Sequence, residues 1–257
     1  MIIRILGCGT SSGVPMIGCD CDVCVSDDPR NRRRRVSILV KSGENSILVD
    51  TSPDLREQLL DARVKSLDAV LYTHGHADHV HGLDDLRSIN YQMNAAIPAY
   101  GTAPTMASIR ERFEYVFVPP DGTWWTRPCL TPVIIDGAFT VGDVSVMPFE
   151  QGHGRSVTTG FRIGGDVAYS TDFKTLDENA FRALSGVKLW IVDCLGYREH
   201  PTHSHLDATL ALIERVQPKL AVLTHMSHQF DYETLLAELP DNVVPGIDGM
   251  EIDTATL

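Results

Sequence analysis

Residues 73–79 read THGHADH, the densest group of potential metal ligands in the sequence. It directly follows LDAVLYT at 67–73, an apolar run that predicts a buried strand. The stretch contains four potential metal ligands: His74, His76, Asp78 and His79. On a helix, at ~100° per residue, their side chains would point around most of the circle, so we expect a loop that wraps a centre. Imidazole and carboxylate bind Zn²⁺ and similar first-row ions, and two ions would divide the four ligands sensibly.

Further polar residues stand at the ends of other apolar runs. VSVMPFEQGH ends at His153, DVAYSTD at Asp172 and LAVLTH at His225. If these strand ends meet at one edge of the sheets, they complete a dinuclear metal site with positions left for substrate. Asp50, at the end of SILVD, fits a carboxylate that orients a ligand histidine. Asp193 is either a second such carboxylate or the cap of the next turn.

Patterns typical of strands and of helices occur along the whole length of 257 residues. Eight apolar runs predict strands, at 2–6, 36–40, 46–50, 67–73, 144–149, 166–171, 188–193 and 220–224. Helical periods cover 54–62, 103–117, 177–185, 206–218 and 232–239. Strands dominate early and alternate with helices later, which predicts a single layered α/β domain over 1–257, with helices packed outside large sheets. The segment 86–135 is the least regular, and Trp124 and Trp125 there either stack on a substrate ring or pack a loop onto the body.

Composition narrows the class of protein. A net charge of −12 opposes general affinity for the nucleic-acid backbone. The run RNRRRR at 30–35 is a local exception, which we interpret as a solvated turn before a strand rather than as a phosphate site. No apolar run approaches the ~20 residues that cross a bilayer, and the N-terminus does not read as a signal peptide, so we expect a cytoplasmic protein. Cysteines stay reduced in that compartment, which favours metal binding over a disulfide for CDCDVC at 19–24.

The metal motif resembles that of the metallo-β-lactamase superfamily. THGHADH, followed in order by the later histidines and aspartate, is similar to the family pattern over about residues 1 to 230. The resemblance implies a four-layer αββα sandwich with a dinuclear site at the sheet edges. It implies that one ion is held by His74, His76 and His153, the other by Asp78, His79 and His225, and that Asp172 bridges them. The reaction stays open, because this fold hosts lactam, thioester, phosphodiester and redox chemistry.

A second resemblance concerns CDCDVC. Together with the GTSSGVP turn and THMSH at 224–228, it looks like the PhnP-type phosphodiesterase branch. That branch implies a closed structural zinc site formed by Cys19, Cys21, Cys24 and His228. It also implies a general acid at His203, although spacing alone does not choose between His203 and His205. The remaining cysteines, Cys8, Cys129 and Cys194, are interpreted as small buried hydrophobes.

We therefore predict a metal-dependent phosphodiesterase that hydrolyses a small cyclic or nucleotide-like phosphodiester. Its cofactors are two divalent ions, Zn or Mn, in the active site and one structural zinc. A hydroxide bridging the two ions and oriented by Asp78 attacks phosphorus, and His203 protonates the departing oxygen. Arg87 and Arg155 are candidate cations for the developing charge. We expect a small phosphodiester or nucleotide as partner and neither duplex nucleic acid nor a membrane, while a homodimer stays open.

Other function classes remain as alternatives. A thioester hydrolase of the glyoxalase II type would usually add a C-terminal helical domain, whereas only a short segment follows His225. A non-hydrolytic biosynthetic protein, like the related PQQ-biosynthesis protein, is tested by whether the dinuclear ligand set is complete. Ribonuclease Z is disfavoured, because the chain is acidic and carries no long basic arm. The sequence decides neither the natural substrate nor the choice between Mn²⁺ and Zn²⁺.

Overall fold

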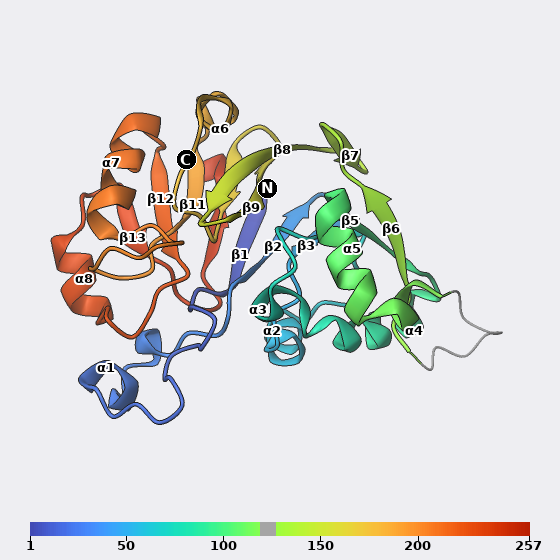
Figure 1. Cartoon of the computed structure of the whole chain (residues 1–257), viewed down its shortest axis with the longest axis horizontal. Coiled ribbons are helices and arrows are strands. Elements are labelled where there is room, and N and C mark those ends of the chain that lie inside the picture. Colours follow the sequence, from blue (N-terminus) through green and yellow to red (C-terminus); the bar gives the residue numbers. More distant parts are fainter. Residues whose placement is uncertain (119–126) are drawn as a thin grey trace.

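Two mixed β-sheets form the centre of the protein (Figure 1). The computed structural model describes residues 1–118 and 127–257. The first seven-stranded sheet has the order β14-β1-β2-β3-β4-β5-β6, with β1 (Ile2–Gly7), β2 (Ser37–Ser42), β3 (Asn45–Val49), β4 (Ala69–Leu71), β5 (Ile97–Gly101), β6 (Leu130–Ile134) and β14 (Glu251–Asp253). The second has the order β13-β12-β11-β10-β9-β8-β7, with β7 (Phe139–Val141), β8 (Val144–His153), β9 (Ser156–Ile163), β10 (Val167–Ser170), β11 (Leu189–Asp193), β12 (Leu220–Thr224) and β13 (Val243–Pro245).

Helices lie on the outer side of each sheet, with α4 and α5 on the first and α7 and α8 on the second (Figure 1). The α-helices are α1 (Asp22–Val25), α2 (Leu55–Asp61), α3 (Ala77–Val80), α4 (Arg87–Met93), α5 (Ala103–Arg112), α6 (Glu178–Leu184), α7 (Leu206–Val216) and α8 (Tyr232–Glu238). Short 3-10 helices span Pro29–Asn31, Leu83–Leu86, Glu114–Phe117 and Thr254–Thr256. Among the described residues, no helix has the length and apolar character that crossing a membrane would need.

Alternation along the strands of the first sheet separates two apolar cores. Ile38 and Val40 of β2 belong to the core between the sheets, whereas Leu39 packs under the outer helices. In β3, Ile47 likewise belongs to the core between the sheets and Leu48 packs under the outer helices. Successive side chains of a strand point to opposite faces, so a sheet covered on both sides needs apolar residues at every position. The predicted four-layer αββα sandwich is confirmed.

The eight predicted strands all occur, with shifted ends, and the structure adds six more: β5, β6, β7, β9, β13 and β14. Two of these, with α4, lie in the segment that the sequence left irregular. The helical pattern predicted over 103–117 is wrong at its end. Phe113, with φ −131° and ψ 42°, leaves the helical conformation, so α5 stops at Arg112 and a 3-10 helix follows.

Candidate metal centre

The metal-binding stretch begins just beyond β4 and is a loop only in its first part, because Asp78 and His79 lie in the short helix α3, contrary to the prediction of a loop throughout. It is anchored by Asp50, which follows the neighbouring parallel strand β3. One oxygen of Asp50 accepts the backbone N–H of Thr73 at 2.9 Å, and the other accepts the Thr73 hydroxyl at 2.8 Å. The second oxygen also lies 2.7 Å from Nδ1 of His79, and both side chains are fully buried. Asp50 therefore orients His79 as the sequence predicted, leaving Nε2 of that ring for a ligand.

The first ligand group joins the loop to the ends of β8 and β10. Nε2 of His74 lies 2.8 Å from Nδ1 of His76. Oδ2 of Asp172 lies 3.8 Å from Nε2 of His74 and 4.0 Å from Nε2 of His153. Ligand atoms bound to one ion at about 2.1 Å lie about 3.4 Å apart, so this spacing fits a divalent metal.

The second group lies on the other side of Asp172. Its Oδ1 is 3.2 Å from Nε2 of His79 and 3.5 Å from Nε2 of His225. Oδ2 of Asp78 lies 3.3 Å and 3.8 Å from the same two nitrogens. Both Nε2 atoms are buried and have no hydrogen-bond partner among the described residues. Buried polar atoms are rarely left unpaired, so this donor set fits a metal ion.

Asp172 stands between the two groups with one oxygen turned to each, which is the arrangement of a bridging ligand. Its backbone has φ 54°, and Asp50 and His225 have φ 61° and 57°. The left-handed region is uncommon for residues other than glycine and occurs often at functional sites. Each of the three residues comes just after a strand, so this turn directs its side chain at the sheet edge.

Charges at the centre are strongly coupled. Burial lowers the pKa of His74 well below its usual value, which keeps this ligand neutral. Burial also opposes charge on His225, but Asp172, Asp78 and Asp193 outweigh it and raise the pKa of His225 to about 9. The pKa of Asp172 is lowered far below its usual range by the charges of His225 and His79, although burial acts in the opposite direction. Protons on the histidines thus compensate the negative charge of the carboxylates, and a divalent cation that binds here would displace these protons.

His203 lies beside this centre, shortly before α7 begins at Leu206. Its Nδ1 is 2.9 Å from Oδ2 of Asp193, which also accepts the backbone N–H of Phe173. Its Nε2 is 3.9 Å from Oδ2 of Asp172, and its ring stacks on that of His225 at 4.5 Å. Asp193 thus orients a histidine instead of capping a turn. His205 lies at the N-cap position of α7, whereas His203 lies next to Asp172 and His225 of the metal-ligand groups.

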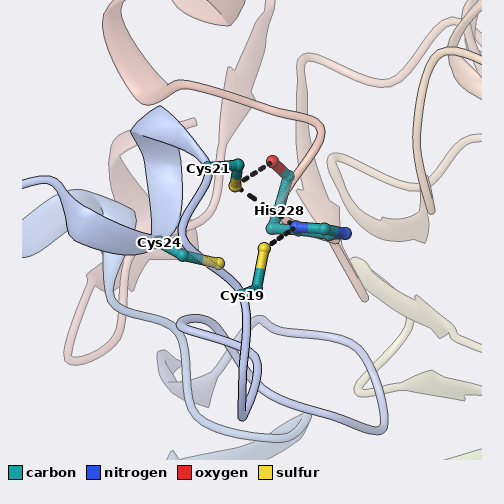
Figure 2. Close-up of side chains that lie close together, drawn as sticks. All are labelled: Cys19, Cys21, Cys24 and His228. Atoms are coloured by element: carbon teal, nitrogen blue, oxygen red, sulfur yellow. Dashed lines mark hydrogen bonds between the residues drawn. The ribbon is translucent and has the colours of Figure 1, made fainter.

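A separate group contains Cys19, Cys21, Cys24 and His228, whose ligand atoms lie within 4.8 Å of one another. Figure 2 shows the three thiols converging on the imidazole, with Nδ1 3.2 Å from Sγ of Cys19 and 3.3 Å from Sγ of Cys21. The backbone N–H of Cys24, followed by His228, lowers the pKa of Cys21 to about 6, which favours the thiolate. Four such ligands without a fifth group fit a closed tetrahedral zinc site.

The arginine run serves the scaffold. Arg30 pairs with Asp28, Arg34 with Asp61 and Arg35 with Asp54 at 2.6–2.7 Å. Arg33 is buried and donates to the carbonyls of Ser227 and Phe230. The run is therefore only in part the solvated turn that the sequence predicted.

Other residues singled out in the sequence divide as follows. Cys8, Cys129 and Cys194 are buried, as predicted. Arg155 is exposed in the turn after His153, and Arg87 is exposed at the start of α4. Trp124 and Trp125 lie outside the described residues. His200 was not predicted as a site residue, although its ring centroid lies 5.2 Å from that of His203; its place in HPTHSH is the signal that could have found it.

Known proteins share this fold. A crystal structure described as a new diphosphatase from the PhnP family superposes with a TM-score of 0.91 and 34% identity, covering 98% of this chain and 97% of that one. Zn²⁺-bound PqqB from Methylobacterium extorquens, at 22% identity and a TM-score of 0.78, shares the fold.

Sequence comparison gives the same family. A Porphyromonas gingivalis protein named octanoyltransferase is 40% identical over 252 residues, or 96% of this chain, and the chain spans half the length of that relative. Residues 45–226 match the beta-lactamase superfamily domain. The chain therefore belongs to the metallo-β-lactamase superfamily and, within it, to the PhnP family.

Proposed function

We propose that this protein is a metal-dependent hydrolase that cleaves a small cyclic or nucleotide-like phosphodiester. The observation that carries the proposal is the pair of His203 and Asp193 beside the metal centre, with Nδ1 of the ring 2.9 Å from the carboxylate. An alkoxide or ribose oxygen leaves poorly unless it is protonated, and a histidine held in this way can supply the proton. A thiolate leaves without such help, so a general acid at this position favours an oxygen leaving group.

The metal ions would be held by the two groups that share Asp172, and the structural zinc by the three cysteines and His228. When bound, the pair of ions would supply an activated water and neutralise charge on the phosphoryl oxygens. Asp78, whose side chain is 12% exposed, is the accessible carboxylate of the second group, and we assign it to orient the attacking water. Asp193 holds Nδ1–H of His203, so Nε2 carries the transferable proton to the leaving oxygen.

A second candidate is a thioester hydrolase. It is favoured by the 40% identical relative named octanoyltransferase, since an octanoyl group is an acyl chain. The chain spans half of that relative, so the activity in its name can belong to the other half. Against the non-hydrolytic alternative, every residue of the dinuclear set predicted from the sequence belongs to one of the two groups of potential ligands that share Asp172.

The test compares turnover of bis(4-nitrophenyl) phosphate, 4-nitrophenyl phosphate and an octanoyl thioester by protein loaded with Mn²⁺ or Zn²⁺. We expect the wild type to hydrolyse bis(4-nitrophenyl) phosphate, and we expect a loss of ~10²-fold or more in His203→Ala, at unchanged metal content, for a diester with an alkoxide leaving group such as 2′,3′-cyclic AMP. The loss for bis(4-nitrophenyl) phosphate should be smaller, because 4-nitrophenolate leaves without a proton. His205→Ala is the matched control and should keep its activity. Thioester turnover without diester turnover would establish the second candidate, and turnover of none of the three by either metal form would refute a hydrolase of these classes.

A further inference from the structure

His200 is a second histidine on the same side of the metal centre as His203. It lies in the segment between β11 and α7, is half-buried, and its ring centroid is 5.2 Å from that of His203. The ring of His203 in turn lies 4.8 Å from that of His153. An imidazole therefore stands next to the proposed acid without belonging to either ligand group.

Hydrogen bonds fix the tautomer of His200. Its Nδ1 accepts the backbone N–H of Thr202 at 3.4 Å and lies 3.2 Å from the Thr202 hydroxyl. A backbone N–H can only donate, so Nδ1 is an acceptor and the proton of the neutral ring sits on Nε2. His203 has the opposite arrangement, because its Nδ1 faces the carboxylate of Asp193. The two neighbouring rings thus differ at Nε2. On His200 this atom carries an N–H that can donate a hydrogen bond, whereas on His203 it is the atom that would give up a proton.

The segment that carries His200 is held against the metal centre. The carbonyl of Thr202 lies 2.9 Å from Nδ1 of His153. A Cβ on Gly154 would come within 2.6 Å of the Thr202 side chain, so this turn and the His200 segment are in direct contact. Burial, followed by the charge of His203, lowers the pKa of His200, which keeps the ring neutral.

We propose that His200 is a catalytic residue that donates a hydrogen bond from Nε2 to a non-bridging phosphoryl oxygen of the substrate, a role that rests on the proposed phosphodiesterase function. A neutral imidazole N–H does not release its proton readily, so it suits stabilisation of developing negative charge rather than proton transfer. His203 then serves the leaving oxygen. His200 thus contacts a non-bridging oxygen of the reacting phosphorus, and His203 contacts the leaving oxygen.

The experiment uses the metal-loaded protein and a series of phosphodiesters whose leaving groups range from nitrophenols to simple alcohols. We expect His200→Ala to lower kcat by about 10- to 100-fold, by the same factor for every leaving group. The loss in His203→Ala should grow as the leaving group becomes more basic. His200→Gln, whose amide nitrogen takes the place of Nε2, should recover most of the rate, whereas His200→Asn should not. Metal content should be unchanged in each variant, and His205→Ala serves as the control from the same segment.

Two readouts do not depend on turnover. Long-range ¹⁵N–¹H NMR should show the Nε2–H tautomer of His200, and inorganic phosphate should bind more weakly to His200→Ala than to His200→Gln. An unchanged kcat in His200→Ala, or a loss that grows with leaving-group basicity, would overturn the assignment. If the wild type hydrolyses no diester, the proposed function fails by itself, and the tautomer and phosphate affinity then decide whether His200 is an anion donor.

Discussion

Replacing Arg33 by methionine should loosen the segment that carries His228. Arg33 is 2% exposed, and its guanidinium donates to the carbonyl of Ser227 at 3.1 Å and to that of Phe230 at 2.7 Å. A third bond reaches the side chain of Asn31 at 3.1 Å. The two carbonyls stand on either side of His228 in the sequence, so the guanidinium ties the histidine of the proposed zinc site to the N-terminal loop.

The size of the effect follows from these bonds. Each buried carbonyl that loses its donor costs about 1–3 kcal/mol. Methionine fills much of the space and avoids burying a charge, which offsets part of the loss. We expect a decrease of about 3 kcal/mol in the free energy of unfolding. If half of this loss lowers the free energy of local opening around His228, zinc affinity should fall about tenfold, since each 1.4 kcal/mol corresponds to a factor of ten.

Urea unfolding and zinc transfer to a chromogenic chelator measure the two quantities. Arg32→Met is the matched control, because Arg32 is exposed and its side chain forms no hydrogen bond or ion pair among the residues the structure describes. That variant should match the wild type in both assays. If Arg33→Met unfolds and releases zinc like Arg32→Met, the argument from the two carbonyls is refuted.

Four further changes test other parts of the structure. Asp172→Ala should strip both ions from the centre, as measured by inductively coupled plasma mass spectrometry, because each group loses one ligand; full occupancy would contradict a bridging ligand. Asp50→Ala should weaken metal binding by about 10- to 100-fold in chelator competition, and equal affinity would argue against its orienting role. Gly75→Ala should lower the free energy of unfolding by about 1–3 kcal/mol, because the new Cβ would lie 2.7 Å from the Ser108 hydroxyl. In urea unfolding, adding Ser108→Gly should recover part of this loss, whereas additive losses in the double variant would exclude the contact. Burial raises the pKa of Asp248 to about 6, so stability that is fully present below about pH 4 is lost as the pH rises through 6. Between about pH 5 and pH 7.5 the wild type should therefore lose about 1 kcal/mol relative to Asp248→Asn, and parallel pH profiles would show that the carboxyl is not perturbed.

The ligand residues at the ends of strands could be predicted from the sequence. Apolar runs that end in His153, Asp172 and His225 predicted one shared edge, and the structure brings these residues together there. The prediction worked because strand direction in a layered sheet forces such ends to meet. Strands such as β9 and β14 were missed, because β9 is rich in small polar residues and is interrupted by Gly160, and β14 has only three residues, two of them charged, so neither carries a clear apolar run.

Features that depend on neighbours along the chain could be predicted from the residues alone. THGHADH places four ligands within six positions, so their proximity follows from chain connectivity, and the apolar runs determined the layered fold. Contacts between residues far apart in the chain depend instead on how the segments pack. The fold brings His203 rather than His205 next to the metal-ligand groups, pairs Asp193 with His203, turns one oxygen of Asp172 to each ligand group, and places His200 beside His203. The physical reason is that side-chain direction depends on backbone turns such as the left-handed residue at Asp172, and on packing between distant segments, neither of which local sequence spacing encodes.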